Sequence, residues 1–480
     1  MGALAFGGLL VVGGCETSPA TGRTFFSGGM DAAGEARLGA QEHKKIVPQF
    51  GGVYDDPALA AYVSSVGGLL AKTTETPDLE FTFTVLDSPI INAFALPGGY
   101  VHVTRGLIAL ADDEAELAGV LAHEIGHVTA RHSAERYGQT MAANIARLGL
   151  GILTGSSAVT KAVGTVGALA VRGYSRQQEY EADLLGVRYL ARAGYDPGAM
   201  ASFLRKLQAD SRLTAEIAGK PGQADKFNIM QTHPRTADRI AAATRAAGVK
   251  AVREPMRARD IYLGKIDGLL YGDNPKQGLA RGRSFLHPIM RFAFEVPPGF
   301  RIVNGARQVA ALGPNGAAIV FDRAGQAFDG SMSAYITRVW AKDIGLGQVE
   351  AITVNGMPAA TGQARLRTRR GARDMRVVAY RYDAQTIYRM LFVTPPEQTR
   401  SLNRALRETT YSFRRLSARE AAAVTPLRLR VHTVKPGETP AALAARLPFP
   451  DHRLERFLVL NGLAPDARLR TGQKVKLIVE

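Results

Sequence analysis

The sequence predicts an α+β protein built from several domains, and three observations support this. The chain has 480 residues, enough for two to four domains that each bury a core of their own. Apolar residues recur at helical spacing through residues 31–250, whereas short alternating strands prevail in residues 285–416. No run of 18 or more uninterrupted apolar residues is present, which argues against an enzyme with several membrane spans.

The only cysteine, Cys15, ends an apolar run that closes on small residues. A single cysteine excludes an intramolecular disulfide. The run resembles the lipobox of a bacterial lipoprotein, which implies a signal segment at residues 1–15 and a lipidated Cys15 that anchors the chain to a membrane. No basic residue precedes Ala3, which departs from that pattern, and the alternative is an uncleaved apolar tail with an incidental cysteine. Residues 16–30 are expected to form a flexible linker.

Two helices and a few strands are predicted before the central motif. Residues 31–50 and 58–72 have apolar positions at helical spacing. Residues 81–86 alternate in the manner of a strand, and residues 93–103 continue extended structure around a break at Pro97-Gly98-Gly99.

An H-E-x-x-H motif follows at His123, Glu124 and His127, inside a segment of helical periodicity. On a helix the two histidines lie four residues apart on one face, so both imidazoles point at one spot. That geometry suits zinc, which accepts neutral histidine nitrogens, and Glu124 is placed to act as a base toward water.

A third ligand is expected 52 residues after His127, in a second predicted helix that carries Glu179 and Asp183 four residues apart. One carboxylate can ligate the metal while the other supports a histidine of the first helix. Two histidines and one carboxylate leave a fourth position open, which is typical of a catalytic zinc site.

These motifs resemble the family of CAAX prenyl endopeptidases, HtpX-type membrane proteases and BepA-like periplasmic proteases. The resemblance covers residues 30–250 and includes Asn92–Gly99, the run Ser175–Asp183, and Thr232-His233-Pro234 followed by Arg239-Ile240. It implies a mainly helical zincin domain of the gluzincin type at residues 31–250, with one zinc ion per chain. In that reading the ligands are His123, His127 and Glu179, the general base is Glu124, and Asp183 orients a ligand, whereas Glu181 is not a ligand.

The resemblance also implies a substrate-binding edge strand in a small sheet beside the site. An exposed strand edge can pair with an extended peptide and hold it without demanding particular side chains. The residues expected to bind substrate are Asn92, Ala93, Phe94, Ala95, Pro97 and Gly98.

His233 and Arg239 are the remaining candidates for catalysis. Arg239 is expected either to stabilise the developing oxyanion or to pair with a buried carboxylate. His233 is expected either to help bind the transition state or to occupy the fourth position on zinc and block water. His132, five residues after His127, should turn away from the ligand face, and it and the remaining histidines are expected to be surface or structural residues.

Residues 141–171, rich in glycine and aliphatic residues, are expected to form apolar helices or a mobile cover over the cleft. Residues 251–284 are expected to be a basic linker, and residues 285–416 a compact α+β accessory domain. Residues 427–480 resemble a LysM module with a βααβ fold, a kind of module that binds N-acetylglucosamine polymers such as peptidoglycan. Pro440 departs from the LysM pattern, in which an apolar residue follows the threonine.

The net charge of +17 lies in the second half of the chain, where residues 251–480 hold 37 Lys and Arg against 19 Asp and Glu. Such a basic half suggests an anionic neighbour, such as the cell wall or a lipid surface, or else a solvated surface without a ligand. No nucleic acid partner is expected.

Taken together, the sequence predicts a zinc metalloendopeptidase of the bacterial cell envelope. It should face the periplasm, be anchored by lipid to the outer membrane rather than the inner one, and act on polypeptides in protein quality control. Two alternatives stay open: a cell-wall scaffold or chaperone with a latent zinc site, and a hydrolase of peptidoglycan peptides.

Overall fold

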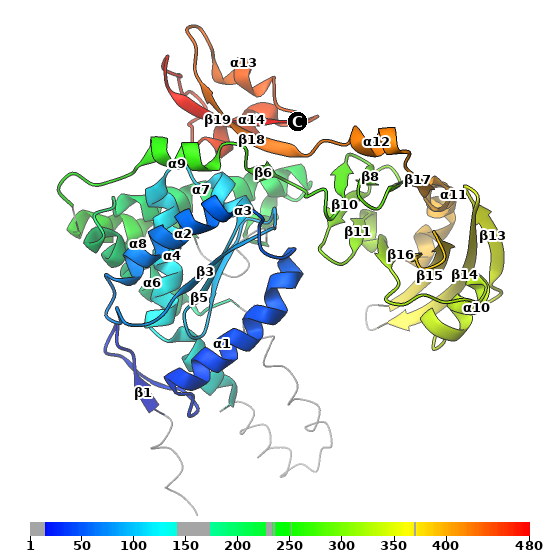
Figure 1. Ribbon diagram of the computed structural model, residues 1–480, viewed down its shortest axis with the longest axis horizontal. Coiled ribbons are helices and arrows are strands. Elements are labelled where there is room, and N and C mark those ends of the chain that lie inside the picture. The colour runs from blue at the N-terminus through cyan, green and yellow to red at the C-terminus, as the bar shows by residue number, and fades with distance from the viewer. Residues whose placement is uncertain (1–14, 142–172, 227–232, 234–235, 251, 369–370) are drawn as a thin grey trace, which may run out of the picture. The chain divides into compact units, whose positions relative to one another are not determined.

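Figure 1 shows the computed structural model, which describes residues 15–141, 173–226, 233, 236–250, 252–368 and 371–480. The chain divides into two compact units. The first combines residues up to 48 with 52–271 and 428–480, and the second combines residues 49–51 with 272–427. Residues 1–14 of the expected signal segment and 142–171 of the expected cover lie outside the described residues. Among the described helices, none is long and apolar enough to cross a membrane.

Helices form most of the first unit, and several begin at a side chain that caps the free backbone amides. Asp113 accepts a hydrogen bond from the amide of Glu116 at the start of α4, and Ser175 and Gln178 form a capping box at the start of α6. Helix α4 is buried along nearly its whole length, with α2, α6, α7 and α9 packed around it. The helices are α1 (Ala32–Ile46), α2 (Pro57–Ala71), α3 (Arg105–Leu110), α4 (Glu114–Thr129), α6 (Arg176–Arg192), α7 (Gly198–Ile217), α8 (Thr236–Val249) and α9 (Arg259–Ile266).

A three-stranded sheet packs against α4. Strand β3 (Thr82–Leu86) is parallel to β5 (Tyr100–Thr104), and β4 (Ala93–Leu96) is antiparallel to β5, which gives the order β3-β5-β4. The two predicted helices before this sheet, the predicted strand and the predicted break are all confirmed. At the break, Gly98 and Gly99 have φ values of +72° and +88°, which glycine adopts without a steric penalty.

The segment expected as an N-terminal linker is folded. Strand β1 (Cys15–Thr17) pairs antiparallel with β2 (Thr24–Phe26). Arg23 holds this hairpin on the helices, because its guanidinium donates two hydrogen bonds, of 2.9 Å and 2.7 Å, to the carboxylate of Glu135. Polar composition suggested a flexible tether, but a bidentate pair with a residue far along the chain orders the segment.

The segment expected as a linker at residues 251–284 also contains regular structure. Helix α9 buries Tyr262, Leu263 and Ile266, and strands β6 (Leu270–Tyr271) and β7 (Leu279–Arg281) follow it. Two of the basic residues that suggested a linker, Arg259 and Lys265, lie on this helix, and a third, Arg257, pairs with Asp113 and Asp196.

The C-terminal module has the predicted βααβ order. Strand β18 (Leu427–Thr433) pairs antiparallel with β19 (Lys474–Val479), and the short helices α13 (Pro440–Ala444) and α14 (Arg453–Leu460) lie between them in sequence. Strand β6 completes this sheet in the order β19-β18-β6. The module therefore shares a sheet with residues that follow the helical domain.

The second unit has a seven-stranded antiparallel sheet in the order β10-β11-β12-β16-β15-β14-β13 and a four-stranded sheet in the order β17-β9-β8-β7. The predicted Asn355-Gly356 turn joins β13 to β14 with both φ values positive, +46° and +76°, which suits a tight hairpin. The elements of the second unit are β8 (Ser284–His287), β9 (Phe292–Glu295), β10 (Arg301–Asn304), β11 (Val309–Leu312), β12 (Ala318–Arg323), α10 (Met332–Tyr335), β13 (Glu350–Val354), β14 (Met357–Thr368), β15 (Gly371–Arg381), β16 (Ile387–Thr394), α11 (Pro396–Ser412), β17 (Arg414–Arg415) and α12 (Ala418–Ala422).

Candidate metal centre and active site

Helix α4 brings the two histidines of the motif together. The Nε2 atoms of His123 and His127 lie 3.1 Å apart, as one helical turn between them requires. Both side chains and that of Glu124 are buried. The motif therefore forms the wall of an interior site.

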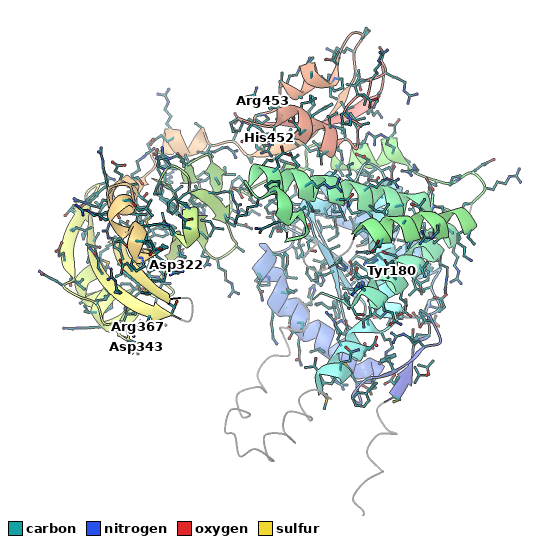
Figure 2. The ribbon with its side chains drawn as sticks, turned by 180° about the vertical axis from the view of Figure 1, so that it is seen from behind. Tyr180, Asp322, Asp343, Arg367, His452 and Arg453 are labelled. Atoms are coloured by element: carbon teal, nitrogen blue, oxygen red, sulfur yellow. The ribbon has the colours of Figure 1, made fainter. Side chains whose placement is uncertain are left out.

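Helix α6 adds the predicted carboxylate. The Oε1 atom of Glu179 lies 3.6 Å from Nε2 of His127, and its Oε2 atom lies 3.6 Å from Nε2 of His123. The two helices approach closely at glycines, since a Cβ on Gly126 would lie 3.1 Å from the Ala182 carbonyl oxygen. Tyr180, labelled in Figure 2, directly follows Glu179 in this helix.

His233 joins this cluster. One nitrogen or oxygen atom from each of His123, His127, Glu179 and His233 lies within 4.8 Å of the others. The Nδ1 atom of His233 lies 2.9 Å and 3.0 Å from the two carboxylate oxygens of Glu179. Burial lowers the pKa of His233, but the adjacent carboxylate of Glu179 outweighs burial and raises this pKa above its ordinary value.

This donor set fits a zinc ion. Ligands at roughly 2.0–2.1 Å from a tetrahedral zinc are separated from one another by about 3.3 Å. The two histidine Nε2 atoms lie 3.1 Å apart, and each of them lies 3.6 Å from a different carboxylate oxygen of Glu179. The ligand types and their spacing therefore match what zinc requires.

Asp183 and Arg239 hold the first histidine in place. The Oδ1 atom of Asp183 lies 3.0 Å from Nδ1 of His123, and Arg239 donates two hydrogen bonds of 2.7 Å to the same carboxylate. Burial raises the pKa of Asp183, but Arg239 and His123 outweigh it and hold this pKa well below the ordinary range. An ionised carboxylate that faces Nδ1 of a histidine directs the Nε2 lone pair toward the metal position.

The geometry favours one of the two roles expected for Arg239. Its Nη1 atom lies 2.9 Å from Oε2 of Glu179 and donates to the carbonyl oxygen of His233 at 3.3 Å. Its other two nitrogens bind Asp183. All three nitrogens thus face carboxylates or a backbone carbonyl, which favours pairing with buried carboxylates over binding an oxyanion.

His132 contacts the predicted ligand His127, contrary to the expectation that it would turn away. Its Nδ1 atom lies 2.8 Å from Nδ1 of His127, and its Nε2 atom lies 3.0 Å from the Glu181 carboxylate. Helical spacing failed here because α4 ends at Thr129 and Arg131 takes a left-handed conformation, with φ of +57°. The chain turns back at Arg131 and returns His132 to the ligand.

Tyr174 is a second residue that the sequence analysis missed. Its ring stacks on the imidazole of His127, with centroids 3.7 Å apart and planes 14° apart. The guanidinium of Arg136 lies over the tyrosine ring at 3.9 Å from its centroid. A tyrosine just before a predicted helix gives no sequence signal for such a contact.

Glu124 is placed differently from the ligands. Within the described part of the chain neither of its buried carboxylate oxygens has a hydrogen-bond partner. The nearest charged contact is Nε2 of His233, 3.7 Å from Oε1. Burial raises the pKa of Glu124, which brings a carboxylate closer to the proton affinity that a general base needs.

An apolar pocket opens beside Glu124. Together with the open solvent at its mouth it takes up about 380 Å³, and one side of it is formed by four apolar residues that share a face of α7. The lining residues are Val120, His123, Glu124, Met200, Phe203, Leu204, Leu207, His233 and Arg239.

The residues expected to bind substrate fall into two groups. Asn92 precedes the edge strand β4, and Ala93, Phe94 and Ala95 lie within it, against α4 and with little exposed surface. The turn at Pro97 and Gly98 instead packs on α1, because a Cβ on Gly98 would lie 2.5 Å from Cα of Ala36. The structure thus assigns the turn a packing contact.

Comparison with known proteins agrees with these features. Residues 57–247 match peptidase family M48, and residues 432–477 match the LysM domain. The chain is 36% identical over 197 residues to a putative beta-barrel assembly-enhancing protease of Vibrio cholerae, covering 39% of each chain. It is 32% identical over 220 residues to the beta-barrel assembly-enhancing protease of Escherichia coli K12, covering 44% of this chain and 43% of the relative.

A third relative is the mitochondrial metalloendopeptidase OMA1 of Schizosaccharomyces pombe, 32% identical over 211 residues, with 43% of this chain and 59% of the relative covered. The chain spans well under two thirds of the length of these relatives. The shared part contains the helices that carry the histidines and carboxylates described above. Residues 57–247 therefore match peptidase family M48 both in sequence and in the residues of the site, and residues 432–477 match the LysM domain.

Proposed function

We propose that this chain is a zinc-dependent metalloendopeptidase that cleaves proteins of the bacterial cell envelope. The observation that carries the proposal is the convergence of His123, His127 and Glu179 at zinc-ligand spacing, next to the carboxylate of Glu124, which has no hydrogen-bond partner among the described residues. Three ligands that leave the fourth metal position to water or to a displaceable group, beside a free carboxylate, are typical of a peptidase site and not of a structural zinc.

Different residues of the chain have different roles in hydrolysis of the peptide bond. A zinc ion held by the three ligands would polarise the scissile carbonyl. Glu124 takes a proton from the attacking water and delivers it to the leaving amine. Asp183 and Arg239 keep His123 oriented, and His132 does the same for His127.

In the absence of substrate, His233 keeps the metal site in a blocked, inactive form. Its imidazole lies among the metal-ligand atoms and also 3.7 Å from Glu124. This position supports the second of its two expected roles, in which the imidazole occupies the fourth place on zinc. A substrate must then displace His233 before water can reach the site.

The substrate is an extended polypeptide with an apolar side chain next to the scissile bond. Strand β4 supplies a sheet edge for the peptide backbone. The pocket beside Glu124 accepts an apolar side chain, since Met200, Phe203, Leu204 and Leu207 line it.

The location of the enzyme is part of the same proposal. The names of the bacterial relatives refer to beta-barrel assembly, which supports unassembled envelope proteins as substrates. The LysM domain supports attachment to peptidoglycan, and lipidation of Cys15 would add a membrane anchor on the periplasmic side of the outer membrane.

Glu124→Gln tests the activity. Wild-type protein should contain one zinc per chain and cleave casein, and Glu124→Gln should retain zinc while its kcat falls by about 100- to 10,000-fold. Glu216→Gln, an exposed change on α7, should leave both unchanged. Cleavage by Glu124→Gln at the wild-type rate would contradict the assignment of the base. Retention of the biological function by that variant would favour the scaffold alternative.

His233→Ala tests the blocked form. The variant should keep its zinc and cleave casein faster than wild type if the imidazole blocks the fourth position. Slower cleavage with unchanged zinc content would instead assign His233 to binding of the transition state.

A further inference from the structure

The LysM domain contacts the peptidase domain through a buried lysine. Lys476 of β19 has no exposed surface, and its ammonium group donates hydrogen bonds of 3.0, 2.9 and 2.7 Å to the carbonyl oxygens of Ala109, Leu110 and Ala111. These carbonyls end helix α3, where no further backbone amide is available to them. A fully buried ammonium group is costly unless all its protons are bound, so this contact specifies one position for the domain.

The same ammonium group belongs to a cluster of charges. It lies 3.1 Å from Oδ1 of Asp112, whose other carboxylate oxygen pairs with Lys206 of α7. Arg259 of α9 donates to the Asp112 carbonyl oxygen at 2.8 Å. The side chain of Asp112 thus joins the LysM domain to α7. The carbonyl oxygen of the same residue binds Arg259 of α9.

Backbone contacts fix the same arrangement independently. The amide of Gly268 donates to the Leu429 carbonyl oxygen, and the amide of Leu429 donates to the Leu269 carbonyl oxygen, both at 2.8 Å. Helix α14, whose N-terminal end is marked by His452 and Arg453 in Figure 2, packs against α7. The LysM domain is therefore attached by its sheet, by one of its helices and by a buried ion.

The helix that receives these contacts is the one that forms the active-site pocket. On α7, Met200, Phe203, Leu204 and Leu207 face the pocket beside Glu124, whereas Lys206 lies on a different face and reaches Asp112. Asp112 also directly precedes Asp113, the N-cap of α4. The charge cluster thus meets both helices that line the pocket.

We propose that the LysM domain is a structural component of the peptidase, which holds α7 against α4 through Lys476, Asp112 and Lys206 and thereby maintains the apolar pocket. This role is distinct from binding to the cell wall and does not require it. It links the catalytic site to a domain that begins 185 residues after the end of the family M48 region, which ends at residue 247, whereas the LysM region begins at residue 432.

Lys476→Met tests the proposal in the full chain, because it keeps the length of the side chain and removes its charge. Lys474→Met is the matched control, since Lys474 lies on the same strand, is 38% exposed and pairs with Asp260 only at 3.5 Å. Hydrogen exchange of the α7 amides should quicken at least tenfold in Lys476→Met and stay at the wild-type rate in Lys474→Met. Limited proteolysis should release the LysM domain from Lys476→Met alone.

The exchange measurement does not depend on catalysis, so it stands even if the chain proves inactive on casein. If Lys476→Met cannot be obtained folded, Gly462→Ala replaces it. A Cβ on Gly462 would lie 2.3 Å from Oδ2 of Asp112, so either the Asp112 carboxylate or the LysM loop must move and the cluster is disrupted. Wild-type exchange in α7 and resistance to proteolysis, in whichever variant is folded, would overturn the proposal.

Discussion

Asp183→Asn should loosen the metal site without changing any ligand. The change keeps the shape of the side chain but removes the charge that faces Arg239 at two contacts of 2.7 Å and His123 at 3.0 Å. Loss of one partner from a buried ion pair costs about 3–5 kcal/mol of folding free energy. Loss of the group that orients a ligand weakens metal binding about 10- to 100-fold.

Two assays separate these effects. Competition with a chelator gives the zinc affinity, and urea unfolding in excess chelator gives the stability of the metal-free protein. Asp238→Asn is the control, since Asp238 is exposed on α8 next to Arg239, and it should change neither quantity. If Asp183→Asn binds zinc as tightly as wild type, Asp183 does not orient His123 and the reasoning fails.

Three other changes probe the surroundings of the site. His132→Phe should weaken zinc binding about tenfold in the same competition assay, because the neighbouring ligand loses the partner of its Nδ1 atom; unchanged affinity would show that this contact is incidental. Burial lowers the pKa of His102 to about 3 from 6.5, so its contribution to stability is complete above pH 6.5 and is lost as the pH falls. The free energy of unfolding should drop by about 2 kcal/mol between pH 7 and pH 5 through this group, and His102→Phe should remove that part of the drop in urea titrations at the two pH values. Gly39→Ala should destabilise the protein by about 1–3 kcal/mol, because the new Cβ would lie 1.9 Å from the Pro97 carbonyl oxygen, whereas Gly68→Ala, which meets no atom within 4 Å, should be neutral or stabilising in thermal unfolding.

Helical periodicity in the sequence was sufficient to predict which residues lie at the centre of the site. The motif on α4 and the carboxylate pair on α6 are set by residues three or four apart on helices, and such relations are visible in a sequence. The sequence left two roles open for Arg239, binding of an oxyanion and pairing with a buried carboxylate, and it did not predict Asp183 as the partner. The contacts of Arg239 with Asp183 and Glu179 favour pairing with carboxylates. These contacts depend on where helix α8 packs, which the sequence does not reveal.

Features that depend on a single backbone angle or on a distant partner were not predictable. His132 reaches His127 only because Arg131 is left-handed, a conformation that arginine rarely takes and that ion pairs with Glu16 and Glu35 support here. Lysine is usually a surface residue, yet Lys476 is buried. Its hydrogen-bond partners lie more than 360 residues earlier in the chain. Neither the contact of His132 with His127 nor that of Lys476 with its partners produces a periodic pattern in the sequence.

The folded hairpin at the N-terminus has a mechanical consequence. A disordered tether of fifteen residues would let an anchored enzyme sweep a radius of about 20 Å, but residues 15–26 form a hairpin that Arg23 fastens to Glu135. If Cys15 carried an acyl chain, as proposed above, the hairpin would therefore hold the peptidase domain close to the lipid surface without a flexible tether. In that case the hairpin, and not a flexible tether, would set the distance between the active site and the lipid surface.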